Sequence, residues 1–271
     1  MPTYAHAQVL PALAPFVASI GYCDGHLPHA WELAMPTGTT QLLANLDRDE
    51  LHSHPAAGDG HNGVQRTGGA ALQGPFSTPT MIDTAEQRQT MWIAFRFGGS
   101  YPFFAVDTAA SHELMIGLED LWGRDGVTLR ERLLEAPTAA GKLQVLQNTL
   151  LAHAVRPLDR DPAVVAAAAA LHRGHSVAAV ADSLGWTAKR LTRRFSQQIG
   201  LTPKRFARVR RFQRVLRRSA SEVTSVDWAR LAAECGFCDQ AHLIHEFRAH
   251  AGTTPLEYSP RSPAELNHVP V

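Results

Sequence analysis

The sequence has little cysteine and no long apolar run. Its 271 residues include only three cysteines, Cys23, Cys235 and Cys238, an odd set without a framework of paired spacings. This usage argues against a disulfide-stapled secreted domain and favours a reducing compartment. No stretch approaches the roughly 18 uninterrupted apolar residues of a membrane span, and the first residues do not have the pattern of a signal peptide. We therefore expect a cytoplasmic protein that does not act in a membrane.

Acidic residues are nearly missing from one part of the chain. Between His172 and Arg218 there are thirteen Lys and Arg residues and a single acid, Asp182. Residues 1–171 have the opposite balance, with 10 basic and 17 acidic residues. The net charge of +1 is therefore the sum of an acidic N-terminal part and a basic C-terminal part. Such asymmetry predicts a polyanionic partner for the C-terminal part. The alternative is a basic face that is simply solvated.

Several signatures of catalysis are also missing. The sequence has no Gly-rich phosphate loop, no nucleophile elbow and no convincing pair of catalytic carboxylates. Ser111, His112 and Glu113 are consecutive, and a helix would point their side chains apart. We therefore expect no enzyme activity and no cofactor.

Two histidine-rich groups raise the question of a metal site. Cys23, His26 and His29 form one group, and His52, His54 and His61 form the other. Zinc sites require three or four ligands in tetrahedral geometry, and histidines in Gly-rich loops are more often solvated. Cys235 and Cys238 have the spacing of a redox pair but fall within a helical motif described below. We expect no metal at any of these positions.

The composition, 45% apolar and 19% charged, is that of a globular protein long enough for two domains. Before about residue 105, short apolar runs at 41–44, 70–72 and 91–97 predict strands, and the polar segment 47–69 predicts a long hairpin loop. Leucines at helical spacing between Ser111 and Val155 predict two or three amphipathic helices. Residues 156–162 contain two prolines and predict a linker. The expected class is α+β.

An internal repeat lies beyond this linker. Residues 180–186 match residues 231–237, and residues 195–206 match residues 247–258. Each copy predicts a short helix, a left-handed turn at Gly185 or Gly236, and a longer helix. Thr202 and Thr254, each followed by proline, predict the N-cap of a further helix in each copy. From Pro203 to about Arg218 a single long helix is expected to join the two copies.

This repeat resembles the C-terminal domain of the AraC/XylS family of regulators. Residues 163–260 cover that domain, and the segment from Gly236 to Phe247, followed by Gly-Thr-Thr-Pro255 and Tyr258, is similar to the family signature. The resemblance implies an all-α domain of two helix-turn-helix units, joined by a long helix, that binds promoter DNA. The N-terminal half resembles a less studied sensor type, which implies a cupin-like β-rich region with trailing helices at 1–155. Residues 156–162 would then be the linker and 261–271 a tail.

A recognition helix buries one face and presents the other to base edges, so its exposed positions are the candidates for reading DNA. The predicted base-reading residues are Lys189, Thr192 and Arg193 in the first unit and Gln240, Ala241, His242, Ile244 and His245 in the second. The predicted phosphate contacts are Arg190, Gln197, Lys204, Arg205 and Arg208. The second unit departs from the family pattern, since Ile244 stands where a small polar residue is usual and His245 where arginine is frequent. We therefore expect the first unit to read most of the sequence.

The remaining expectations concern ligands and partners. Trp31, Trp92, Phe95 and Phe97 are candidate walls of a pocket for a small-molecule effector, with core packing as the alternative. RNA polymerase and a second copy of the chain are further candidate partners. A DNA-repair fusion would carry a reactive Pro-Cys-His-Arg motif, which the sequence lacks, and a cupin-like enzyme would carry a bound metal.

Overall fold

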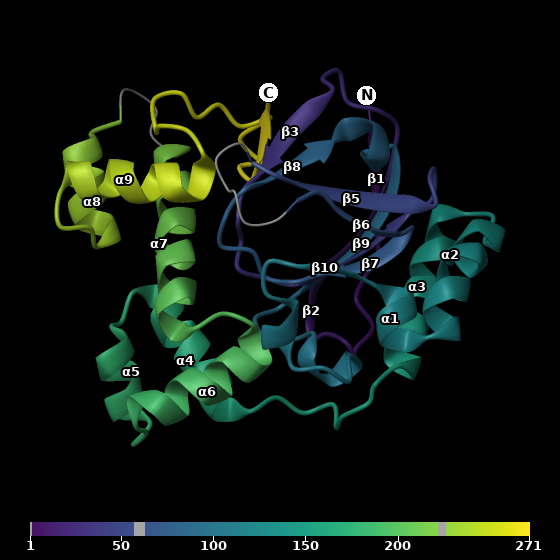
Figure 1. Cartoon of the computed structure of the whole chain (residues 1–271), viewed down its shortest axis with the longest axis horizontal. Coiled ribbons are helices and arrows are strands. Elements are labelled where there is room, and N and C mark those ends of the chain that lie inside the picture. Colours follow the sequence, from purple (N-terminus) through teal and green to yellow (C-terminus); the bar gives the residue numbers. More distant parts are fainter. Residues whose placement is uncertain (1, 57–62, 222–225) are drawn as a thin grey trace.

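The computed structural model describes residues 2–56, 63–221 and 226–271. A β-rich N-terminal region with three covering helices is followed by a helical region, as expected for the α+β class (Figure 1). His61, one of the histidines considered as a metal ligand, lies outside the described residues. No described helix has the length and apolarity needed to cross a membrane.

Two antiparallel sheets form the N-terminal region. The first contains, in spatial order, β1 (Thr3–His6), β2 (Val17–Asp24), β9 (Gln89–Phe95), β4 (Gln41–Asn45), β7 (Ala70–Gln73) and β10 (Met115–Gly117). The second contains β11 (His268–Pro270), β3 (Trp31–Ala34), β8 (Thr80–Asp83), β5 (Glu50–Pro55) and β6 (Gln65–Gly68). Short 3₁₀ turns η1 (Thr84–Gln87), η2 (Tyr101–Phe103) and η3 (Thr108–Ser111) lie in the connections.

Alternation along the first sheet separates a core face from an inner face. On β9, Met91, Ile93 and Phe95 are buried in the main hydrophobic cluster, whereas Thr90 and Trp92 point to the other side. Successive side chains of a strand face opposite sides of the sheet, so one strand supplies both surfaces. The core face is covered by α1 (Leu118–Trp122), α2 (Arg124–Glu135) and α3 (Ala139–Ala152), in agreement with the helices expected from the leucine spacing.

The segment expected to be one long polar loop contains two strands. β5 pairs with β6 and also with β8. Residues 50–55 and 65–68 are therefore strands and not parts of a loop. Leu51 and Ser53 are the buried positions of β5, two residues apart. Leu51 packs against Ala71 and Met115. The polar composition of the segment gave no sign of this apolar contact. The expectation of a loop throughout 47–69 was therefore wrong.

The helical region follows the repeat. Its elements are α4 (Pro162–Arg173), α5 (Val177–Ser183), α6 (Ala188–Ile199), α7 (Pro203–Ser219), α8 (Trp228–Cys235) and α9 (Gln240–Ala251). Gly185 and Gly236 have φ of +61° and +82°, which confirms the left-handed turns. Thr202 accepts a hydrogen bond from the Arg205 amide and caps α7 as predicted.

The second copy ends differently from the first. Thr254 accepts from the Glu257 amide at 3.3 Å, but only a turn follows, so the expectation of another helix there was wrong. The hydroxyls of Thr253 and Thr254 both donate to the Glu257 carboxylate, which closes this turn locally.

The C-terminal tail returns to the N-terminal region. Strand β11 pairs antiparallel with β3, so that Val269 lies opposite Leu33, and the C-terminal end of the chain lies beside β3 (Figure 1). Val269 is buried in a cluster that also holds Met35 of the N-terminal region and Phe212 of α7. The tail therefore ties the second helix-turn-helix unit to the sheet, which the sequence did not predict.

Candidate functional site

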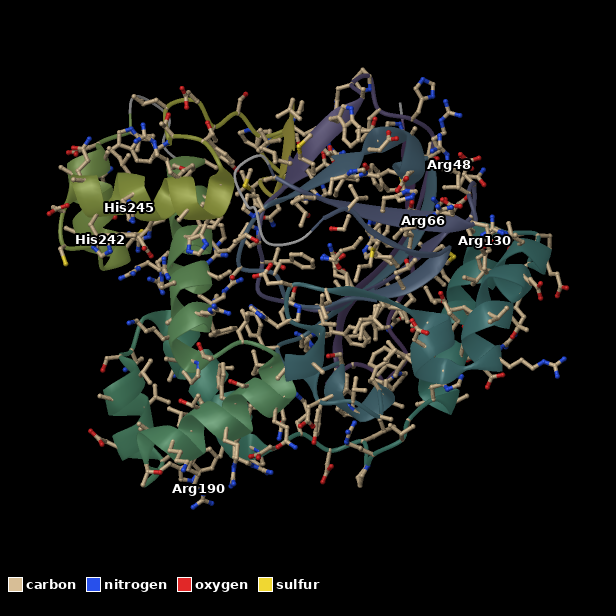
Figure 2. The ribbon with its side chains drawn as sticks, viewed as in Figure 1. Arg48, Arg66, Arg130, Arg190, His242 and His245 are labelled. Carbon is tan, nitrogen blue, oxygen red and sulfur yellow. The ribbon has the colours of Figure 1, made fainter. Side chains whose placement is uncertain are left out.

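The first recognition helix, α6, presents a cationic outer face. Leu191, Phe195 and Ile199 are buried, which fixes the orientation of the helix. The exposed residues on the other side are Lys189, Arg190, Thr192 and Arg193. The Arg190 guanidinium lies 4.8 Å from the centre of the Trp186 ring, at the outer edge of the domain (Figure 2). These four side chains therefore share the exposed side of α6.

Gln197 is engaged elsewhere. Its side-chain amide donates to Asp107 of the N-terminal region at 3.2 Å, and α6 packs against η3 at this end. Its position at the interface between the two regions differs from the free phosphate contact that we expected.

The second recognition helix, α9, has a less basic outer face. Gln240, Ala241 and His245 are exposed, whereas His242 and Ile244 are half-buried. The His242 ring packs edge-on against Phe237 and its Nδ1 accepts from the Cys238 amide at 3.3 Å. Ile244 packs against the hydrophobic cluster of the second unit. Figure 2 places His242 and His245 on the outer side, away from the sheets.

The cations of α7 are not equally available. Lys204 and Arg205 are exposed, and Arg205 lies 3.3 Å from His112 Nε2. Arg208 donates two hydrogen bonds of 2.8 Å to Glu246 of α9, so it is not the unpaired phosphate contact that we expected. Burial raises the pKa of Glu246, but the hydrogen bonds and charge of Arg208 outweigh it and hold that pKa below its usual range. This ion pair joins α7 to the second recognition helix.

A groove of about 810 Å³ separates the two helix-turn-helix units. Its cationic lining residues are Arg173, Lys204, Arg208, Arg211 and Arg214. Residues of α4, α5, α7, α8 and α9 line it. Two carboxylates, Glu234 and Glu246, line the groove as well, so its cations outnumber its acids.

Both recognition helices are docked on the N-terminal region by their C-terminal ends. His250 Nδ1, near the end of α9, donates to the Ser77 carbonyl at 2.7 Å, and Gln197 of α6 donates to Asp107. In Figure 1 both helices run from the outer side toward the sheets. Their N-terminal turns, where helix-turn-helix proteins contact bases, are therefore directed away from the N-terminal region.

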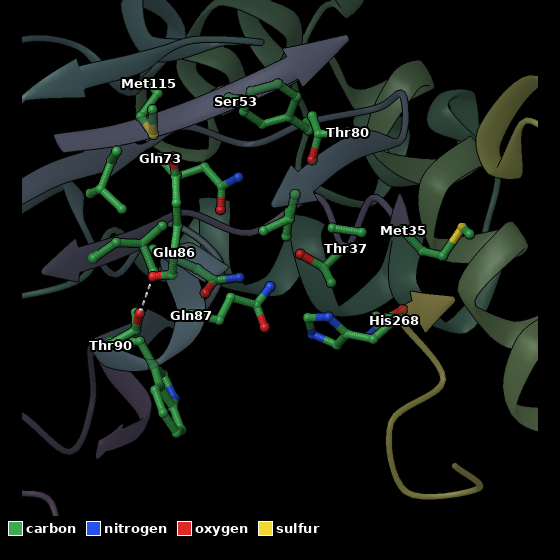
Figure 3. Close-up of a pocket in the computed structure, with 18 of the residues that line it drawn as sticks. Met35, Thr37, Ser53, Gln73, Thr80, Glu86, Gln87, Thr90, Met115 and His268 are labelled. Carbon is green, nitrogen blue, oxygen red and sulfur yellow. Dashed lines mark hydrogen bonds between the residues drawn. The ribbon is translucent and has the colours of Figure 1, made fainter. Parts of the chain in front are cut away.

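A pocket of about 440 Å³ lies between the two sheets. The inner faces of β4, β5, β7, β8 and β9 line it, together with η1 and the tail (Figure 3). Of the four aromatic residues expected as walls, only Trp92 lines it. Phe95 points from the opposite face of β9 into the core, Phe97 packs edge-on against Phe206 of α7, and Trp31 packs edge-on against His54.

The tail forms one wall of this pocket through an ion-pair cluster. Glu32 of β3 is fully buried and accepts from Arg261 at 3.0 Å, from His268 at 2.7 Å and from Gln87 at 2.9 Å. Burial alone would raise the pKa of Glu32, but these donors outweigh it and lower the pKa to about 2. Residues of the tail were not singled out from the sequence, because nothing in their composition distinguishes them from a solvated end.

The cysteine and histidine groups do not form a further site among the described residues. No group of three or more His, Cys, Asp or Glu side chains in residues 2–56, 63–221 and 226–271 has the geometry to hold a metal. Cys235 is buried, and burial raises the pKa of its thiol, whereas Cys238 is exposed. The two therefore differ in the environment that a redox pair would share.

Comparisons with known proteins address the helical region. Residues 180–261 match the model of a helix-turn-helix domain. A transcriptional regulator from Chromobacterium violaceum, described as containing an AraC-type DNA-binding domain, is 25% identical over 35% of this chain and 88% of its own, with a TM-score of 0.32. The xylose-binding transcription activator XylR is 22% identical over 44% of this chain and 38% of its own, with a TM-score of 0.31. ToxT from Vibrio cholerae is 8% identical over 95% of this chain and 97% of its own, with a TM-score of 0.40.

Comparison with curated proteins gives no significant match. The helix-turn-helix match coincides with the tandem repeat, whose two longer helices are each capped at the N-terminus and ended by a glycine of positive φ. Residues 180–261 therefore contain a helix-turn-helix domain, in agreement with the tandem repeat of this segment.

Proposed function

We propose that the chain is a sequence-specific regulator that binds promoter DNA and responds to a small molecule held by its N-terminal region. The observation that carries this proposal is the combination of two surfaces in one molecule. One is the exposed cationic surface of α6, and the other is the pocket of about 440 Å³ between the two sheets. A volume of this size falls within the range of roughly 300–1,000 Å³ that is usual for small-molecule sites.

The two functions are assigned to different parts of the chain. Residues 163–260 read DNA, with Lys189, Thr192 and Arg193 as the principal base contacts. Residues 1–155 hold the effector, and 156–162 connect the two. XylR is described as binding xylose and one ToxT structure as holding an unsaturated fatty acid, so effector binding by this chain has parallels among the proteins it resembles. RNA polymerase is the expected partner at the same promoter.

The proposal is tested by gel-shift titration of the full chain on promoter fragments at several salt concentrations. We expect binding that weakens steeply with salt, because phosphate contacts release counterions. The double variant Lys189→Ala/Arg193→Ala should lose sequence preference. Arg132→Ala, an exposed arginine on α2, is the matched control and should bind like the parent chain. Equal affinity for promoter and unrelated DNA in the parent chain would contradict sequence-specific regulation.

A second measurement tests effector sensing. A molecule that binds the pocket should raise the unfolding midpoint by mass action and change the affinity for promoter DNA. A ligand that raises the midpoint but leaves DNA affinity unchanged would contradict the regulatory part of the proposal.

A further inference from the structure

The charged side chains that line the pocket between the sheets already have partners of opposite charge. Arg261 is paired with Glu32 and Glu265, and His268 is paired with Glu32. His52 is paired with Glu86, whose other carboxylate oxygen accepts from the His52 amide at 3.0 Å. An anionic ligand would find no unpaired cation among these lining residues, and a cationic ligand would find no unpaired carboxylate.

Four neutral polar side chains in the same pocket have no hydrogen-bond partner among the described residues. Gln41 and Gln73 are cross-strand neighbours on β4 and β7, and Ser53 and Thr80 lie on the facing sheet. In the described part of the chain, the side chains of these four residues make no hydrogen bond with the protein. Figure 3 shows Gln73, Ser53 and Thr80 around the open space. Each carboxamide offers both donors and an acceptor, and each hydroxyl offers one of each kind.

The remaining lining is apolar. Leu43, Leu51, Ile82 and Met115 contribute aliphatic surface, and Trp92 contributes an aromatic ring. Pockets of this kind bind ligands by apolar contact and orient them with a few placed polar groups. We propose that the pocket takes an uncharged small molecule with hydroxyl or amide groups, bound between Gln41 and Gln73 on one sheet and Ser53 and Thr80 on the other. This proposal rests on the proposed function, because it names the class of effector.

The experiment measures thermal unfolding of the full chain against a library of matched sets. Each set holds a neutral molecule, its carboxylate and its amine, such as glucose with glucuronate and glucosamine, or benzamide with benzoate and benzylamine. We expect neutral members to raise the midpoint by about 5–10 °C at about 100 times Kd. Gln73→Leu should abolish the rise, whereas Gln144→Leu on the exposed face of α3 should keep it.

The outcomes separate this inference from the proposed function. A rise caused mainly by carboxylates or amines overturns the ligand class but leaves effector sensing in place. No rise with any member of the library overturns both.

A second observation concerns the segment between β7 and β8. Pro75 packs against Gly200, the glycine that ends α6, since a methyl group added there would lie 2.5 Å from the proline ring. Pro79 lies near Gly252, the equivalent glycine at the end of α9, where an added methyl group would lie 3.9 Å from the ring. Between the two prolines, Ser77 accepts the hydrogen bond from His250. One short segment therefore contacts the ends of both recognition helices.

Three other residues of this segment, Gly74, Phe76 and Thr80, line the pocket. Thr78 does not line it, and its hydroxyl donates to Glu113 at 3.1 Å. Glu113 holds the segment by accepting from the Ser77 amide at 2.8 Å and from its hydroxyl at 2.6 Å. Glu113 has φ of +57°, a conformation that costs a residue with a side chain of order 1–3 kcal/mol and that often marks a functional position.

We infer that residues 74–80 transmit occupancy of the pocket to the relative placement of the two recognition helices. The inference is independent of the ligand class, because it depends on the contacts of this segment with α6 and α9. A ligand that moves Phe76 would displace both prolines. The distance between the two recognition helices would then change.

The test is a selection by the full chain from a DNA library in which the gap between two half-sites varies. The parent chain should favour one gap. Pro75→Ala/Pro79→Ala should reduce that preference by about fivefold or more, the lower end of usual coupling between sites. Pro137→Ala, in the exposed loop between α2 and α3, is the control and should leave the preference unchanged. An unchanged preference in a double variant that unfolds at the parent midpoint overturns the inference.

Discussion

Removing the charge of Glu32 tests whether the tail is bound to the sheet by ion pairing. In the variant Glu32→Gln the side chain keeps its size, but an amide nitrogen replaces a carboxylate oxygen that accepts from Arg261 or His268. The surrounding donors then lose their charged acceptor in a fully buried position. Removal of one partner from a buried ion pair is strongly destabilising because it leaves the other charge uncompensated.

The magnitude follows from the pKa of this carboxyl. A pKa that falls from 4.5 in the unfolded chain to about 2 in the folded chain corresponds to about 3 kcal/mol of stability at neutral pH. Since the folded pKa is the lower one, the contribution is present above pH 4.5 and is lost as the pH falls toward 2. We expect Glu32→Gln to lower the free energy of unfolding by about 3 kcal/mol at pH 5, and by less than half of that at pH 3.

Urea unfolding of both chains at pH 7, 5 and 3 measures this difference, and Glu131→Gln on the exposed face of α2 is the control. The comparison between pH 5 and pH 3 is the decisive one, because the contribution of the Glu32 carboxylate falls over that interval. A difference between the two chains that is the same at pH 5 and pH 3 would refute the reasoning.

Three further predictions concern DNA reading and the docked helix ends. Arg193→Ala should reduce the binding free energy for the preferred DNA site by about 1–3 kcal/mol and relax the preference at one base pair. His245→Ala should have a smaller effect on both quantities, and binding-site selection at one salt concentration measures both variants. Arg208→Ala should reduce the free energy of unfolding, because its carboxylate partner Glu246 on α9 is left unpaired; an unchanged midpoint in urea unfolding would contradict this expectation. Gly200→Ala should be more destabilising than Gly185→Ala in urea unfolding, because both residues have positive φ but only Gly200 meets Pro75; equal losses would contradict the docking contact.

Local patterns in the sequence were sufficient for the helix-turn-helix region. Glycines that need positive φ, threonines that cap helices and apolar positions at i, i+4 and i+8 act within one or two turns, so Gly185, Gly236 and Thr202 could be placed without tertiary information. The exposed cations of α6 follow from the same spacing. The class of partner followed from charge, because the excess of Lys and Arg lies in one segment.

The pocket and its connection to the reading helices were decided by tertiary structure. Strand alternation shows that Trp92 and Phe95 lie on opposite faces, but not which face meets a cavity; that depends on the helices that cover the other side. Arg208 and Glu246, which join α7 to α9, are 38 positions apart in sequence, and β11 pairs with β3 across most of the chain. Such contacts carry no periodic signal. The sequence by itself therefore determined the DNA-binding units, whose stabilising contacts are mostly local, whereas only the fold determined that the tail closes the pocket and that one short segment contacts the pocket and both recognition helices.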